Sequence, residues 1–290
     1  MCTPELPEKL SLKGIYALFG YFWYTNKLVS GKQKPTTQMS TFKDNFSKQA
    51  EVYVKFRPTY PKELFEFLKG LTLEHKLAWD CGTGNGQSAV KLADYYEKVY
   101  AADPSQEQIK NAIPHDKIVY KVENAENPSV IEDNSVDLIT VAQAVHWFDF
   151  DKFYTQVMRV LKTNGIIAVW AYGIPTIDKE LDNIIKDFHD NIVGEFWLPE
   201  NKLIEKEYST IPFPFDEIKT PEFFIKKQVT LTETLGHFRS WSATQKYIDK
   251  YNENPIDILS QKLQDHWQDI EKQKEMTWKL ILKVGKIVSC

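Results

Sequence analysis

From about residue 76 onward, short apolar segments alternate with segments whose apolar residues recur at helical spacing. The predicted strands cover residues 76–80, 99–103, 118–122, 136–141 and 166–170. Strands separated by helices of ~10–15 residues are joined by right-handed crossovers, which make the strands parallel. The fifth segment is nearly all apolar, as expected for a strand buried on both faces. We therefore predict an α/β fold with a doubly wound, mostly parallel sheet, resembling a Rossmann fold.

The helical segments between these strands carry start and stop signals. Pro61 is expected to open a helix over residues 62–71, since proline suits the first turn. Further helices are predicted over residues 87–96, 105–112 and 150–161, the last closed by Asn164-Gly165 as a C-terminal cap. Upstream, a helix over residues 42–56 must end at the two prolines of the segment 57–61.

The alternation loosens after Gly173. We predict helices over residues 178–193, 232–242 and 255–272, and strands over 222–230 and 276–288, which bring the sheet to seven strands. The segments 173–221 and 232–275 are interpreted as helical insertions over the open edge of the sheet. Ligands of such folds bind outside the carboxyl ends of the strands, so these insertions are expected to form a substrate lid.

The first 38 residues differ from the rest, and we treat residues 39–290 as a single domain. Residues 12–23 are apolar and aromatic but are too few to span a bilayer, which needs ~20 apolar residues. They lack a clear small-residue cleavage site of a signal peptide. Either Met39 is the natural start and residues 1–38 are an upstream extension, or the segment is an ordinary helix packed on the domain.

Charge and cysteine content restrict the function classes. The net charge is -4 and no run of basic residues stands out, which argues against a nucleic-acid partner and favours a small-molecule substrate. The three cysteines, Cys2, Cys81 and Cys290, form neither a disulfide framework nor a zinc-binding spacing. We expect no metal, no transmembrane segment, a reducing cytoplasmic compartment, and a monomer or weak dimer.

A glycine loop, Asp80-Cys81-Gly82-Thr83-Gly84-Asn85-Gly86, lies between the first predicted strand and the following helix. Glycines allow sharp turns and close approach of a ligand to the backbone. The helix that follows offers free N–H groups and the positive end of its dipole. The spacing is G-x-G-x-G instead of the dinucleotide G-x-G-x-x-G, which counts against NAD. At this point a tight turn without a ligand remains an alternative.

Three further segments follow the next three strands. Asp103 ends the second strand, where a carboxylate can accept hydrogen bonds from ribose hydroxyls or cap the next helix. Asn124-Ala125-Glu126 follows the third strand, and the segment 142–149 follows the fourth. The carboxyl ends of parallel strands meet at one edge, so these residues are expected near the glycine loop.

Together these motifs resemble those of class I S-adenosylmethionine-dependent methyltransferases. Tyr53, the segment 57–61, Asp103-Pro104-Ser105, Gln143-Ala144-Val145-His146-Trp147-Phe148-Asp149 and Ser240-Trp241-Ser242-Ala243-Thr244 resemble one small-molecule group in particular. That group includes trans-aconitate methyltransferases and farnesoic acid methyltransferase-like proteins. The resemblance runs from about Phe42 to the C-terminus.

The resemblance implies S-adenosylmethionine as cofactor and a small methyl acceptor. A carboxylate, methylated to an ester, is one such acceptor. The alternatives are a thiol, an amine or a hydroxyl, or a non-catalytic cofactor-binding protein. By analogy, the cofactor is lined by Tyr53, Arg57, Asp80, Gly82, Gly84, Asp103, Ala125, Glu126 and Gln143.

The acceptor side is predicted from chemistry and position. His146 and Trp147 are the candidate catalytic residues, with His146 acting as a general base or, as we favour, orienting the acceptor by a hydrogen bond. Arg57 can bind a carboxylate through two parallel hydrogen bonds. Tyr172, Arg239 and Trp241 are the candidate substrate-binding residues.

Overall fold

The computed structural model describes residues 56–287. The predicted helix at residues 42–56, Tyr53 and the segment 1–38 therefore lie outside the described residues, apart from Phe56. Helix α2 (Lys62–Leu71) begins directly after Pro61, as predicted. Its buried residues Leu64, Phe65 and Leu68 lie on one face, which packs on the sheet. No helix among residues 56–287 is long and apolar enough to cross a membrane.

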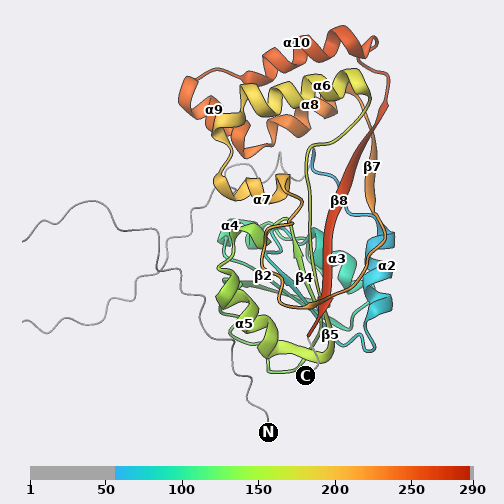
Figure 1. Cartoon of the computed structure of the whole chain (residues 1–290), viewed down its shortest axis with the longest axis vertical. Coiled ribbons are helices and arrows are strands. Elements are labelled where there is room, and N and C mark those ends of the chain that lie inside the picture. The colour runs from blue at the N-terminus through green and yellow to red at the C-terminus, as the bar shows by residue number, and fades with distance from the viewer. Residues whose placement is uncertain (1–55, 288–290) are drawn as a thin grey trace, which may run out of the picture. The chain divides into compact units, whose positions relative to one another are not determined.

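The sheet confirms the predicted doubly wound, mostly parallel architecture (Figure 1). Five strands pair in parallel: β1 (Leu77–Cys81), β2 (Lys98–Asp103), β3 (Ile118–Val122), β4 (Val136–Ala142) and β5 (Leu161–Tyr172). The order is β3-β2-β1-β4-β5-β8-β6, in which the long strand β8 (Lys274–Lys286) runs antiparallel to β5. Strand order reverses beside β1, so the carboxyl ends of β1 and β4 face the expected ligand crevice.

The described part of the sheet has eight strands, one more than the predicted seven. The extra strand arises because two short strands pair with different parts of β8. Strand β6 (Asp216–Glu217) pairs with Lys286 and Gly285, whereas β7 (Phe224–Val229) pairs with the first half of β8. The first half of β8 pairs with β7, and its second half pairs with β5 and β6.

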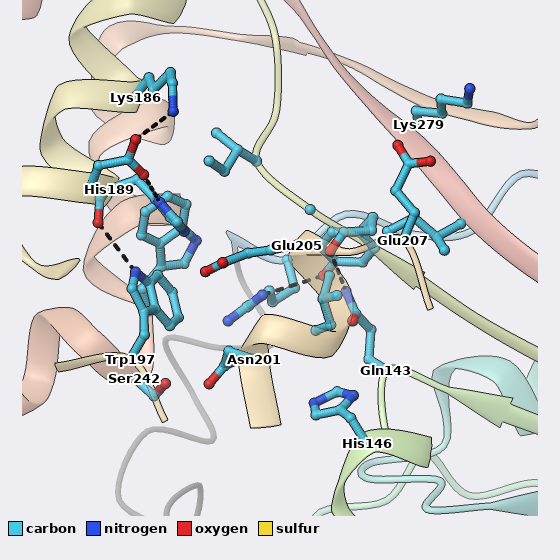
Figure 2. A pocket seen from close by; sticks show the side chains of 18 of the residues that line it. Gln143, His146, Lys186, His189, Trp197, Asn201, Glu205, Glu207, Ser242 and Lys279 are labelled. Atoms are coloured by element: carbon cyan, nitrogen blue, oxygen red, sulfur yellow. Dashed lines mark hydrogen bonds and ion pairs between the residues drawn. The ribbon is translucent and has the colours of Figure 1, made fainter. Parts of the chain in front are cut away.

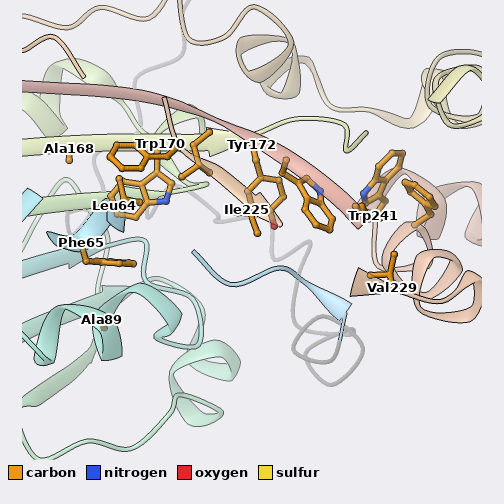
Figure 3. Packing of buried hydrophobic residues seen from close by; sticks show 14 of the residues in the cluster. Leu64, Phe65, Ala89, Ala168, Trp170, Tyr172, Ile225, Val229 and Trp241 are labelled. Carbon is orange, nitrogen blue, oxygen red and sulfur yellow. The ribbon is translucent and has the colours of Figure 1, made fainter. Parts of the chain in front are cut away.

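Hydrophobic residues cover both faces of the sheet. Side chains alternate along a strand, so neighbouring residues of β1 enter different clusters: Ala78 packs with α2 and Trp79 with α5 (Phe150–Val160). Helices α3 (Gln87–Ala93) and α4 (Gln106–Lys110) complete the crossovers. Figure 3 shows the first cluster continuing from Phe65 and Trp170, past Tyr172 and Ile225, to Trp241.

The predicted cap at Asn164-Gly165 is wrong. Helix α5 ends at Val160, and Leu161 is already extended, with φ -72 and ψ 133. Strand β5 starts there and runs through Gly165. A Cβ on Gly165 would lie 2.9 Å from the carbonyl oxygen of Val136, so this glycine permits close approach to β4. Gly165 therefore serves a close contact between neighbouring strands and does not cap a helix.

Four helices form a group that we call the helical layer: α6 (Lys179–Asp187), α8 (Leu231–Arg239), α9 (Ser242–Tyr251) and α10 (Pro255–Trp267). Figure 1 shows this layer at the end of the β7–β8 ribbon, with the short helix α7 (Lys202–Glu205) between it and the sheet. The predicted helix over residues 178–193 is present as two consecutive helices, because α6 passes into a π-helix, η3 (Phe188–Ile192). Helix α9 was not predicted.

Candidate functional site

The glycine loop follows β1, where a buried strand ends against β2 and β4. Gly82, Gly84 and Gly86 all have positive φ, at 68°, 57° and 89°. The N–H groups of Gly82 and Thr83 both donate to the carbonyl oxygen of Ala102, 2.9 and 3.0 Å away. A Cβ on Gly82 would lie 2.5 Å from the Cβ of Ala144. The loop thus packs tightly against the segment after β4, and only glycine satisfies both constraints.

Gly84 differs from its neighbours because a side chain there would meet little of the surrounding protein. The atom nearest to a Cβ there would be Oε1 of Gln108, at 3.8 Å. Beside it, the side chain of Asn85 is buried, and its Nδ2 has no hydrogen-bond partner among the described residues. An open glycine next to an unsatisfied buried donor is the arrangement expected where a polar ligand approaches the backbone.

The side chain of Asp80 is hydrogen-bonded to the glycine loop through Thr83. Its carboxylate is fully buried and accepts hydrogen bonds from the hydroxyls of Thr83, at 2.5 Å, and Thr140, at 2.7 Å. Burial raises the pKa of Asp80, although these hydrogen bonds counteract the shift. Both oxygens are used within the protein, so the structure places Asp80 in a position that stabilises the loop.

Asp103 connects the loop with the next helix. One oxygen accepts the N–H of Gly84 and the other that of Ser105, each at 2.9 Å. The cap of α4 is the side chain of Ser105, which accepts the N–H of Gln108, so Asp103 is not itself the N-cap. Asp103 thus fixes the backbone of Gly84 and Ser105 at the carboxyl end of β2.

The pair after β3 is divided between two environments. Ala125 is buried in the cluster that also contains Phe148. Glu126 is partly exposed and accepts the N–H of Asp149 at 2.9 Å, which links the loop after β3 to the start of α5. Both residues therefore lie beside the segment after β4, although β2 and β1 separate β3 from β4 in the sheet.

Gln143 begins that segment with an unusual backbone conformation. Its φ is 56°, its N–H donates to the carbonyl oxygen of Trp170, and its Nε2 donates to that of Tyr172. A short 3₁₀-helix, Val145–Trp147, follows. These contacts to β5 fix the turn that presents His146 and Trp147 at the carboxyl end of the sheet.

A pocket of about 610 Å³ opens at this edge (Figure 2). It is lined by six of the predicted residues: Arg57, Gln143, His146, Trp147, Tyr172 and Trp241. They are spread from residue 57 to residue 241 of the chain, so the fold brings them together. The loop glycines Gly82 and Gly84 and the carboxylate residue Asp103 are not among the lining residues. Arg239 also lies outside the lining; its side chain is exposed on α8, two residues before the buried Trp241.

Arg57 lies beside Tyr172 in this pocket. Its Nη1 is 3.5 Å from the Tyr172 hydroxyl, and its Nη2 donates to the carbonyl oxygen of Ser240 at 3.3 Å. These contacts join the segment before α2 to β5 and to the end of α8. They hold the guanidinium at the wall of the pocket.

His146 is buried, and its Nδ1 lies 2.9 Å from the hydroxyl of Tyr208. Burial lowers the pKa of His146 to about 4. The ring is therefore neutral near pH 7. Burial also raises the pKa of Tyr208, which keeps its proton. Tyr208 was not predicted as a site residue, because nothing in the chain around it marks it as a partner of His146.

Other lining residues were also missed. They include Lys186, His189, Asp190, Trp197, Asn201, Glu205 and Glu207. All belong to the segment between β5 and β6, predicted as an insertion over the sheet edge. The aromatic residues and the His-Asp pair of this segment were visible in the sequence, but no motif singled them out. Among residues 56–287, no three His, Cys, Asp or Glu side chains could hold a metal ion.

Comparisons with known proteins agree with this geometry. A methyltransferase-domain family model matches residues 79–169, which hold the glycine loop and the segment after β4. A Dictyostelium discoideum protein named as a methyltransferase is 34% identical over 79% of this chain and 88% of its own length. A Saccharomyces cerevisiae protein named as an S-adenosylmethionine-dependent methyltransferase is 30% identical over 42% of this chain and 45% of its own.

A solved structure extends the comparison to the fold. A protein from Anaeromyxobacter dehalogenans described as a type II methyltransferase superposes with a TM-score of 0.76 and 32% identity. The match covers 81% of this chain and 100% of that one. The fold and the site define a class I methyltransferase. The chain belongs to the S-adenosylmethionine-dependent methyltransferase family, and S-adenosylmethionine is its cofactor.

The described residues fit this cofactor. The sparsely contacted Gly84, the unpartnered Nδ2 of Asn85 and the carboxylate of Asp103 lie together at the carboxyl ends of β1 and β2. Gln143 belongs both to this edge and to the pocket lining. The narrower likeness to the trans-aconitate and farnesoic acid groups stays a prediction, because no relative described above names its acceptor.

Proposed function

We propose that the chain methylates a carboxylate oxygen of a small organic acid that binds in the 610 Å³ pocket. The observation that carries this proposal is the burial of His146, whose pKa is lowered to about 4. A group with so low a pKa is a poor acceptor for the proton of an alcohol or a protonated amine. A carboxylate is ionised near pH 7 and has no proton to lose.

The roles of the lining residues follow from this choice. Arg57 would bind the carboxylate, in the place where Tyr172 and the carbonyl of Ser240 hold its guanidinium. His146, fixed by Tyr208, would orient the acceptor by a hydrogen bond from its other ring nitrogen. Trp147 and Trp241 would pack on the apolar part of the acid.

The chemistry divides simply between cofactor and protein. When bound, S-adenosylmethionine supplies a methyl group activated by its positively charged sulfur, so that transfer to a carboxylate oxygen needs no proton removal. The protein must hold the acid in line and exclude water. Correct positioning of two reactants can supply as much as ~7–11 kcal/mol. The helical layer and α7 would act as the predicted lid over the pocket.

The test is product analysis with a panel of small aromatic and aliphatic acids. Release of S-adenosylhomocysteine would be measured, and mass spectrometry would locate the added methyl group. Amines, thiols and alcohols with the same carbon skeletons serve as matched controls. Methyl esters from acids are expected. Methylation confined to the amines, thiols or alcohols would refute the carboxylate proposal.

A specific observation favours an amine as the second candidate. The carboxylate of Glu205 points into the pocket (Figure 2), and no hydrogen bond or ion pair joins it to another described residue. An anionic group of this kind attracts an ammonium group. The same panel separates the two candidates. A chain that binds cofactor but releases no S-adenosylhomocysteine with any member would instead be a non-catalytic binding protein.

The orienting role of His146 has its own test. His146→Gln should lower turnover with the methylated acid, while calorimetry shows unchanged cofactor affinity. If His146 were a general base, the loss would grow with the pKa of the acceptor across alcohols and amines. Unchanged turnover would show that the residue has neither role.

A further inference from the structure

The proposed function leaves unexplained a histidine on the helical-layer side of the pocket. His189 belongs to the π-helix η3, is 9% exposed, and lines the pocket. Its Nδ1 lies 2.6 Å from Oδ1 of Asp190. Lys186 pairs with the other oxygen of Asp190. A π-helical turn inside a helical segment often marks a functional site.

Asp190 determines which nitrogen of His189 carries the proton. A hydrogen bond from Lys186, the larger cause, and one from His189 lower the pKa of Asp190, so its carboxylate is ionised near pH 7. An ionised carboxylate only accepts hydrogen bonds, so Nδ1 of His189 must be the donor. In the neutral ring the second nitrogen, Nε2, is then an acceptor with no proton of its own.

Two tryptophans fix the plane of this ring. Trp197 lies 5.0 Å from it, centroid to centroid, and Trp241 lies 5.6 Å from it at 90°. The indole N–H of Trp197 also donates to the carbonyl oxygen of His189. All three rings line the pocket. In Figure 2, His189 and Trp197 face the cavity from the side opposite Gln143 and His146.

We propose that His189 is a specificity-determining residue that accepts a hydrogen bond from a hydroxyl or amino group at the far end of the methyl acceptor. This inference rests on the proposed function, in which the reacting carboxylate lies near Arg57 and His146. Trp197 and Trp241 pack beside the same end of the acceptor. A site built to accept a hydrogen bond discriminates against ligands that lack the donor, because its own polar group is then left unpaired.

The experiment compares ligands that differ by one hydroxyl. Binding of phenylacetate and 4-hydroxyphenylacetate, and of 3-phenylpropionate and its 4-hydroxy derivative, would be measured by calorimetry with S-adenosylhomocysteine present. The wild-type chain should bind the hydroxylated member about three- to tenfold more tightly, as one net hydrogen bond provides. In His189→Phe this preference should disappear. The matched control His266→Phe, at an exposed histidine of α10, should keep it.

A second variant guards against misfolding. Asp190→Asn keeps the size of the side chain but no longer forces the proton onto Nδ1, so the preference should fall several-fold. A preference that survives in both variants would overturn the inference. So would equal binding, or no binding, of the paired ligands by the wild-type chain. Failure of the proposed function appears separately, as methylation of an atom other than a carboxylate oxygen, and leaves the hydroxyl preference intact.

Discussion

The Nδ1 atom of His146 lies 2.9 Å from the hydroxyl of Tyr208, although the two residues are 62 positions apart. Tyr208 has a left-handed backbone conformation, φ 54°, and so does Glu207 before it, φ 51°. This turn after α7 brings the tyrosine beside His146, where both are buried. The pair joins the segment after β4 to the segment that covers the pocket.

Removing the tyrosine hydroxyl should therefore impair the reaction more than the fold. Tyr208→Phe leaves Nδ1 of His146 without its partner, which costs about 1–3 kcal/mol in a buried site. We expect turnover of the methylated acid to fall about tenfold, with cofactor affinity unchanged. Steady-state kinetics and calorimetry measure the two effects.

Tyr154→Phe is the matched control for this prediction. The hydroxyl of Tyr154 donates to the carbonyl oxygen of Pro212 at 2.7 Å, away from the pocket lining. The control should lower thermal stability by a similar amount but keep turnover. An equal loss of turnover in both variants would show that the hydrogen bond to His146 has no special role.

Gly82 should tolerate no side chain. In Gly82→Ala the positive φ costs ~1–2 kcal/mol, and overlap of the new Cβ with Ala144, at 2.5 Å, adds about 1–3 kcal/mol. Urea unfolding should show this loss, and cofactor affinity should fall with it. Gly70→Ala, in α2 with nothing within 4 Å of the new Cβ, should instead stabilise by ~0.5–1 kcal/mol. Equal effects would contradict the packing argument.

Stability should fall in mild acid because His146 is buried in its neutral form. Its pKa is about 4 in the folded chain, against 6.5 for an unperturbed histidine, so between these values the unfolded chain binds more protons. The free energy of unfolding is then unaffected by His146 above about pH 6.5 and falls as the pH drops toward about 4. Between about pH 7 and pH 5 the loss should be about 2 kcal/mol.

The buried His237, with a pKa lowered to about 3, acts in the same direction. Urea unfolding at the two pH values measures the combined effect. His146→Phe should reduce the loss by its own share, whereas His266→Phe, at an exposed position, should leave it unchanged. A pH dependence that is identical in both variants would contradict the neutral, buried state of His146.

Asp103 should be needed for cofactor affinity. Asp103→Asn replaces one carboxylate oxygen by an amide donor, which faces the N–H of either Gly84 or Ser105. Hydrogen bonds to charged groups contribute about 1.5–3 kcal/mol, so the dissociation constant for S-adenosylmethionine should rise about ten- to hundredfold. Asp133→Asn, at an exposed carboxylate paired with Arg159, is the control. An unchanged affinity of Asp103→Asn for S-adenosylmethionine would refute the prediction that Asp103 is needed for cofactor binding.

Local signals explain why much of the core was predictable. Helix α2 and strand β3 have the predicted bounds, because a proline and a run of apolar residues act over a few positions. The glycine spacing of residues 82–86 is likewise a local signal, since glycine permits the positive φ that each of these positions adopts. Asn164-Gly165 misled because the same dipeptide serves a helix cap and a close strand contact.

The amino-acid sequence by itself determined the alternation of strands and helices, the glycine loop, and the acidic residue that ends β2. The tertiary structure alone decided that Trp241 lines the pocket while Arg239, two residues earlier, faces outward. It also decided that Tyr208 contacts His146, 62 positions away, and that His189 lines the same pocket as Gln143. The physical reason is range: backbone preferences act between neighbouring residues, whereas side chains meet in a pocket only after distant elements have packed.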